Sequence, residues 1–165
     1  MASGTDPIHQ LEEKPTILII QDCFQTPAVY KDLLDRLVSL GYPTVHPLLP
    51  TCSDAQDPNF PSLTLLDDAT AVQSELVRLV EREQKTVMVV MHSYGGLVGS
   101  EAILEAMSHI KRKEHGLLGG VIHLFFVSAS LVGPGGSMLD GLDVSPNHKV
   151  EVNTPFLQTP ILLTS

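Results

Sequence analysis

The sequence is poor in positive charge and in cysteine, and each shortage excludes a class of protein. Only 10 Lys and Arg residues stand against 19 Asp and Glu residues, which gives a formal net charge of −9 at pH 7. This charge argues against a nucleic acid or an anionic membrane surface as partner. The two cysteines, Cys23 and Cys52, form neither a disulfide framework nor a metal-binding pattern. We therefore expect no metal and no cofactor.

No targeting or membrane-spanning segment stands out either. Residues 1–14 are polar and acidic and lack the apolar centre of a secretory signal. The longest apolar run, residues 120–132, is shorter than a bilayer span and is interrupted by Ser128 and Ser130. We expect a cytoplasmic protein that does not enter a membrane.

The sequence does contain enough apolar material for one folded domain. Hydrophobic residues make up 43% of the 165 residues, and the mean hydropathy is +0.16. A chain of this length buries about two-thirds of its unfolded surface. From the changes in composition we predict a polar arm at residues 1–15, a core at residues 16–132 and a tail at residues 133–165.

Strand and helix patterns alternate along the predicted core. Apolar runs predict strands, and apolar residues that recur every three or four positions predict helices. The predicted strands cover residues 16–20, 44–49, 86–91 and 120–128, and the predicted helices cover residues 27–40, 64–84 and 94–113. This alternation favours an α/β fold with a doubly wound, mostly parallel sheet and any ligand at the carboxyl ends of its strands. His123, inside the last strand, is expected to be a hydrogen-bonded core residue.

Ser93 lies where the strand at residues 86–91 runs without a spacer into a helix. A serine hydroxyl is a poor nucleophile until a base takes its proton, so a catalytic serine must be lifted clear of the sheet. The helix that follows directs unpaired N–H groups and the positive end of its dipole at the same place, where they stabilise negative charge. The alternative is an ordinary turn in which Ser93 caps the helix.

The turn resembles the nucleophile elbow of the α/β-hydrolase family, G-x-S-x-G. Gly95 supplies the second glycine, and Met91 stands in place of the first. The segment Val90-Met91-His92-Ser93-Tyr94-Gly95-Gly96 and the loop Phe24-Gln25-Thr26-Pro27 are similar to those of small fungal members. The resemblance covers residues 15–139 and implies the doubly wound sheet of that family.

The resemblance also implies roles for particular residues. Ser93 would be the nucleophile, and the backbone N–H groups of Cys23 and Tyr94 would form the oxyanion hole. The segment from residue 133 onward would begin the cap that covers the substrate pocket.

Asp22 departs from the family pattern, which has glycine at that position of the loop. An ionised carboxylate that faces the pocket would repel a developing oxyanion by about 4 kcal/mol at a separation of about 4 Å and an effective dielectric of about 20. One oxyanion donor contributes about 3 to 4 kcal/mol, so the repulsion would cancel it. A carboxylate that points to solvent would have little effect.

The acid and the base of a catalytic triad are not identified. The resemblance implies an acid after the next strand and a histidine after the one beyond it, and residues 161–164 resemble the start of the acid-bearing strand. We expect a C-terminally truncated chain that lacks the last strands of the sheet. His46, His92 and His148 are not well placed to serve as the base.

Two functions follow from these features. The resemblance implies hydrolysis of a small-molecule ester, lactone or thioester, or acyl transfer from it, through Ser93, with a role in fungal secondary metabolism. The alternative is a catalytically impaired, truncated hydrolase-like chain that is a binding or partner module or a non-functional product. A sheet without its last strands would expose the strand at residues 120–128 as an edge, and such an edge promotes self-association.

Overall fold

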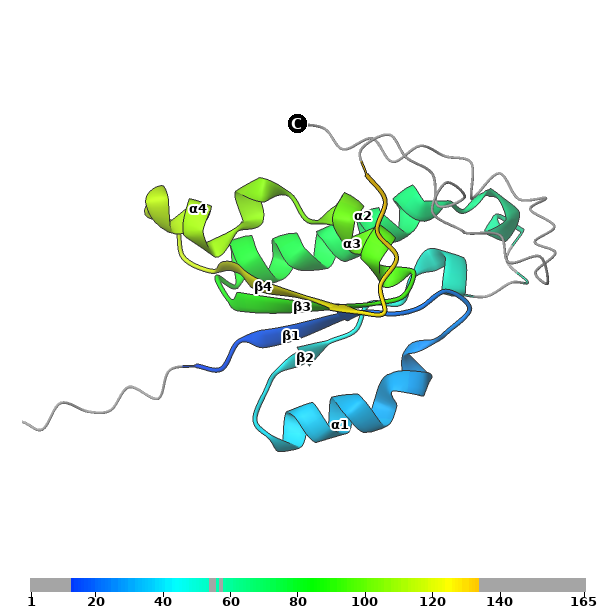
Figure 1. Ribbon diagram of the computed structural model, residues 1–165, viewed down its shortest axis with the longest axis horizontal. Coiled ribbons are helices and arrows are strands. Elements are labelled where there is room, and N and C mark those ends of the chain that lie inside the picture. Colours follow the sequence, from blue (N-terminus) through cyan, green and yellow to red (C-terminus); the bar gives the residue numbers. More distant parts are fainter. Residues whose placement is uncertain (1–12, 54–55, 57, 134–165) are drawn as a thin grey trace, which may run out of the picture.

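Parallel strands form one sheet in the computed structural model, which describes residues 13–53, 56 and 58–133. The strands are β1 (Thr16–Ile20), β2 (Thr44–Val45), β3 (Thr86–His92) and β4 (Gly120–Val127), in the spatial order β2-β1-β3-β4. Helix α1 (Lys31–Ser39) covers one face, whereas α2 (Leu65–Val77), α3 (Gly95–Ala102) and α4 (His109–Glu114) lie on the other (Figure 1). The doubly wound, parallel α/β sheet that the sequence predicts is therefore confirmed.

Short helical turns complete the connections between these elements. Three of them are 3-10 helices that begin at or next to a proline, whose fixed φ suits the first turn. The turns are η1 (Pro27–Tyr30), η2 (Pro50–Cys52), η3 (Phe60–Ser62), the π-helical turn η4 (Arg78–Arg82) and η5 (Glu105–Met107). Pro27 begins its helix as the sequence predicts, and η4 extends α2 over most of the predicted helix at residues 64–84.

The core lies between the sheet and helices α2 and α3. Every residue of β1 is buried, as expected for a central parallel strand that is covered on both faces. The predicted apolar stripe of the helix at residues 64–84 faces this core. Its members are all buried: Ala69, Val72, Leu76, Leu79 and Val80.

The single helix predicted at residues 94–113 is wrong, because the structure breaks it into α3, η5 and α4. The chain leaves α3 at Ile103, which has an extended conformation, and Ser108 is extended as well. The break turns Met107 into the core and lets Ser108 form a bridge with Val121. Burial of Met107 and sheet pairing thus outweigh the helical pattern of the segment.

The last strand, β4, is more exposed than the sequence predicts. β4 is not a buried strand, because its first two residues are buried and its last six are exposed. His123 is one of the exposed residues, with its ring 4.4 Å from the ring of Phe125, so it is not a core residue. In the described part of the chain β3 is the only strand that pairs with β4, which forms one edge of the sheet, as the sequence suggests; Val121 of β4 also forms the single bridge with Ser108.

Candidate active site

Ser93 lies at the apex of a strained turn between β3 and α3. Its φ of 53° falls in the left-handed region, which residues other than glycine rarely adopt. Two backbone hydrogen bonds hold the turn to the end of β4 and the segment after it: Ser93 N donates to Val127 O at 3.2 Å, and Ser130 N donates to Ser93 O at 2.9 Å. The side chain is partly exposed, at the carboxyl end of β3 where ligands of parallel sheets bind.

Gly95 permits the close approach of α3 to β1 behind this turn. A Cβ at position 95 would lie 2.4 Å from the carbonyl oxygen of Ile20, closer than real Cβ atoms come. This close contact explains the requirement for glycine after the serine in the elbow pattern. The helix can start directly behind Ser93 only because position 95 has no side chain.

Met91 occupies the place of the other glycine, and Gly99 provides the space for it. The Met91 side chain is 1% exposed, and its Sδ would lie 2.3 Å from a Cβ built at Gly99. The missing glycine of the strand is therefore compensated by a glycine one turn further along α3. Sequence patterns do not reveal this partner, because the two positions meet only after β3 and α3 have packed.

The predicted oxyanion donors converge on one oxygen atom of the protein itself. Asp22 Oδ1 accepts a hydrogen bond from Cys23 N at 2.8 Å and a longer one from Tyr94 N at 3.5 Å. Of the two orientations that the sequence leaves open for Asp22, the structure shows the inward one. The carboxylate lies at the two N–H groups, where the resemblance to the family would place the oxygen of a substrate.

The same hydrogen bonds decide the ionisation of Asp22. Partial burial alone would raise the pKa of its carboxyl group, but hydrogen bonds from the Ser93 side chain, Cys23 and Tyr94 outweigh burial and lower the pKa. Asp22 is therefore a carboxylate at neutral pH and a weak base. Burial, together with the neighbouring charge of Asp22, raises the pKa of the Cys23 thiol to about 11, so Cys23 contributes its N–H group rather than a thiolate.

Asp68 fixes the residue that follows Ser93. This carboxyl group is 0% exposed and accepts hydrogen bonds from Tyr94 Oη at 2.8 Å, Thr51 Oγ1 at 2.6 Å and Thr51 N at 2.9 Å. Burial raises the pKa of Asp68 despite these bonds. The sequence analysis did not find this role, because Asp68 suits the first turn of α2 equally well.

Tyr30 holds the loop that carries Asp22. The Asp22 N–H group donates to Tyr30 Oη at 2.9 Å, and Tyr30 Oη lies 2.8 Å from His92 Nδ1. His92 is thus tied to Tyr30. His46 packs edge-on against the Tyr30 ring with a centroid distance of 5.0 Å.

A general base is not found next to Ser93 in the described ranges. None of the histidines within residues 13–53, 56 and 58–133 hydrogen-bonds the Ser93 side chain. Burial lowers the pKa of His46, and its two ring nitrogens have no hydrogen-bond partner there. His148 and the tail that the sequence relates to a cap lie outside the described residues.

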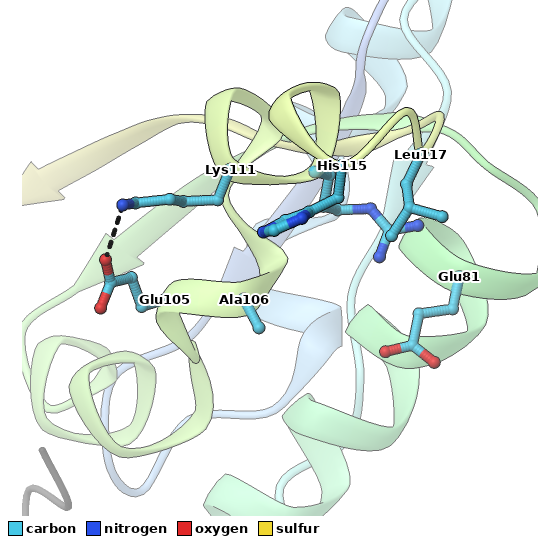
Figure 2. A pocket seen from close by; sticks show the side chains of 7 residues that line it. Glu81, Glu105, Ala106, Lys111, His115 and Leu117 are labelled. Carbon is cyan, nitrogen blue, oxygen red and sulfur yellow. Dashed lines mark ion pairs between the residues drawn. The ribbon is translucent and has the colours of Figure 1, made fainter.

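A cavity of about 380 Å³ lies far from Ser93 and is lined by Glu81, Lys111, Arg112, His115 and Leu117, among others (Figure 2). These residues flank the amino ends of β3 and β4, whereas Ser93 follows the carboxyl end of β3. The Arg112 guanidinium is used for structure, because it donates to Val80 O at 3.2 Å and to Leu118 O at 2.9 Å. This cavity therefore has no part in chemistry at Ser93.

Two features are absent from the described part of the chain. It contains no cluster of three or more His, Cys, Asp or Glu side chains that could hold a metal ion. None of its helices has the length and apolar character that a membrane span requires.

Comparison with known proteins identifies relatives of the same fold. Over 92 residues the chain is 32% identical to "Probable hydrolase R7" of Phoma sp. (strain ATCC 20986 / MF5453), a match that covers 56% of this chain and 36% of the relative. A variant of tomato methylketone synthase I in complex with β-ketoheptanoate matches with a TM-score of 0.56 and 18% identity over 86% of this chain and 53% of that protein. An extracellular α/β-hydrolase from a Paenibacillus species matches with a TM-score of 0.54 and 16% identity over 76% of this chain and 45% of that protein.

The chain thus spans between about a third and about half of the length of these relatives. At such low identity the two solved structures show a shared fold and nothing more. The model of the alpha/beta hydrolase family matches residues 21–161, which include the strained turn at Ser93 and the loop that carries Asp22. The chain belongs to the α/β-hydrolase family.

Proposed function

We propose that this protein is a serine hydrolase that acts on a small-molecule ester, lactone or thioester, by hydrolysis or acyl transfer. In this proposal Ser93 attacks the carbonyl carbon, and the N–H groups of Cys23 and Tyr94 bind the oxygen that becomes negatively charged. The acid and the base come from residues outside the described part of the chain. The similarity of the elbow and loop motifs to fungal family members supports a role in fungal secondary metabolism.

The observation that carries the proposal is the geometry of the Ser93 turn. Ser93 is partly exposed, has a φ of 53° and lies just before α3, and the two N–H groups of Cys23 and Tyr94 point at one oxygen position. An ordinary N-cap serine has an extended conformation and uses its side chain to bond the helix. The N-cap residue of α3 is Tyr94 and not Ser93, which favours the catalytic interpretation.

The experiment is hydrolysis of p-nitrophenyl acetate and of an acyl thioester by the full chain. We expect Ser93→Ala to lower the rate by about 10²-fold or more, because an uncatalysed background is all that remains without the nucleophile. Ser130→Ala is the matched control, since Ser130 contacts the same turn through its backbone N–H alone. Equal rates for the wild-type protein and Ser93→Ala would contradict the proposal.

A second function is favoured by a different observation, the apolar edge strand β4. Ile122, Leu124, Phe125, Phe126 and Val127 are between 40% and 47% exposed. An edge strand with exposed apolar side chains on both faces is a template for another strand. We propose self-association through β4 as the alternative, with light scattering of the full chain as its test. A monomer at all concentrations would contradict it.

A further inference from the structure

Asp22 fills the position that an open oxyanion hole leaves free for substrate. Its Oδ1 atom takes the hydrogen bonds of both Cys23 N and Tyr94 N. A carbonyl oxygen bound by these donors would have to displace that atom. Its negative charge would also be developing beside a carboxylate, which repels it.

The protein holds the carboxylate in this place from both sides. In front, Cys23 N and Tyr94 N donate to its Oδ1 atom at 2.8 Å and 3.5 Å. Behind it, the Asp22 N–H group is bound by Tyr30 Oη, which is itself 2.8 Å from His92 Nδ1. The orientation of Asp22 is therefore part of a hydrogen-bond network and not that of a free surface side chain.

We infer that Asp22 is a specificity-determining residue, an internal anion that occupies the oxyanion hole and slows the reaction of acyl substrates whose carbonyl oxygen needs both donors. Compounds that do not place negative charge between Cys23 N and Tyr94 N are not slowed in this way. The inference rests on the proposed role of Ser93, and it predicts that removal of the carboxylate opens the hole.

The first test measures how fast a fluorophosphonate reacts with Ser93 in the full chain. In this reaction the Ser93 Oγ–P bond forms as the P–F bond breaks, fluoride leaves, and the hydroxyl proton passes to water. We expect Asp22→Gly to react about 10²-fold faster than the wild-type protein, because loss of one oxyanion donor changes enzyme rates by about 10² to 10³. Asp22→Asn should give a smaller gain, since its amide still fills the space.

Asp22→Ala is the second variant in case the glycine loop does not fold. Glu105→Gln is the matched control, because it also removes one negative charge but lies in η5, at the amino ends of the strands. A wild-type protein that reacts as fast as Asp22→Gly and Asp22→Ala would overturn the inference while leaving the role of Ser93 intact.

The second test does not depend on a reactive serine. In a Ser93→Ala background, acetate is titrated against the backbone amide NMR signals of Cys23 and Tyr94. We expect acetate to shift both signals in Asp22→Gly and to bind at least about tenfold more weakly when Asp22 is present, given the charge repulsion. Equal binding with and without Asp22 would overturn the inference. Binding in Asp22→Gly, combined with no fluorophosphonate reaction in any variant, would support the inference and contradict the proposed function.

Discussion

Two buried or partly buried carboxylates beside Ser93 differ in how the fold treats their charge. Asp22 is stabilised as an anion by N–H groups and a hydroxyl group, so its pKa is lowered from its ordinary value of 3.8. Asp68 is fully enclosed, so burial raises its pKa from the same value. The fold therefore favours ionisation of the first group and opposes ionisation of the second.

This contrast predicts opposite effects of pH on the free energy of unfolding. Stability from Asp22 is present above pH 3.8 and is lost as the pH falls through its lowered pKa. Stability linked to Asp68 is present below pH 3.8 and is lost as the pH rises through its raised pKa. Relative to the wild-type protein, Asp22→Asn should become less stable, and Asp68→Asn more stable, as the pH rises from about 3 to about 7.

Urea denaturation at several pH values measures the free energy of unfolding of each variant. The slope of its difference from the wild-type protein against pH is then compared for the two variants. The constant loss from altered hydrogen bonds does not affect these slopes, because it is the same at every pH. Asp35→Asn serves as control, since Asp35 lies on the exposed surface of α1 and pairs with Lys31. Parallel slopes for Asp22→Asn and Asp68→Asn would contradict the two environments described for these residues.

The sequence identified Ser93, Cys23, Tyr94 and Asp22 as the residues of interest but not how Asp22 is oriented. Local patterns predict a turn and its donors, because these depend on neighbours along the chain. The orientation of Asp22 depends on Tyr30 and on Tyr94, which are 8 and 72 positions away. The hydrogen bond from Tyr94 to Asp68 also joins residues that are distant in the sequence, so local patterns do not predict it. The proposed catalytic roles stay predictions.

At the scale of elements, the strand-turn-helix unit depends on how β3 packs against α3. Most strand and helix positions followed from periodicity, but β2 spans only Thr44–Val45 of the strand predicted at residues 44–49. The continuous helix predicted through residues 94–113 is wrong after Ala102, because burial of Met107 in the core outweighs the helical pattern. The fit of Met91 against Gly99 is a second tertiary feature, and it gives a sharp prediction.

Gly99→Ala should destabilise the protein by about 1 to 3 kcal/mol, because the new Cβ would overlap Met91 Sδ. In a Met91→Ala background the same change should cost close to nothing, which gives a coupling energy of about 1 kcal/mol or more. Gly96→Ala is the matched control: its Cβ would meet Ser130 O at 2.4 Å, so Met91→Ala should not relieve it. Urea denaturation of the single and double variants measures these energies. Additive effects of Met91→Ala and Gly99→Ala would contradict the compensation.

At the scale of the whole molecule, the β4 edge is the feature that departs most from a closed fold. Its last six residues, most of them apolar, are exposed in the described part of the chain. The sequence suggested such an edge, because the resemblance places further strands beyond it. It did not show how exposed the strand is, which depends on what packs on both faces.

Self-association through this edge predicts that a charge on β4 keeps the chain monomeric. Phe126→Lys should weaken association by about tenfold or more, because lysine on an edge strand opposes pairing with a second strand. Leu104→Lys is the matched control, since Leu104 is similarly exposed at 45% but lies outside the sheet. Light scattering across a concentration series measures the change. An effect of Leu104→Lys as large as that of Phe126→Lys would contradict a role of the edge.

The most direct measurement for the whole account is to map, by mass spectrometry, where a fluorophosphonate attaches to the full chain. We predict one modified residue, Ser93, with a signal that Asp22→Gly strengthens and that Ser93→Ala abolishes. Attachment at other serines alone, or an unmodified Ser93 in both the wild-type protein and Asp22→Gly, would contradict the assignment of Ser93 as the reactive hydroxyl group.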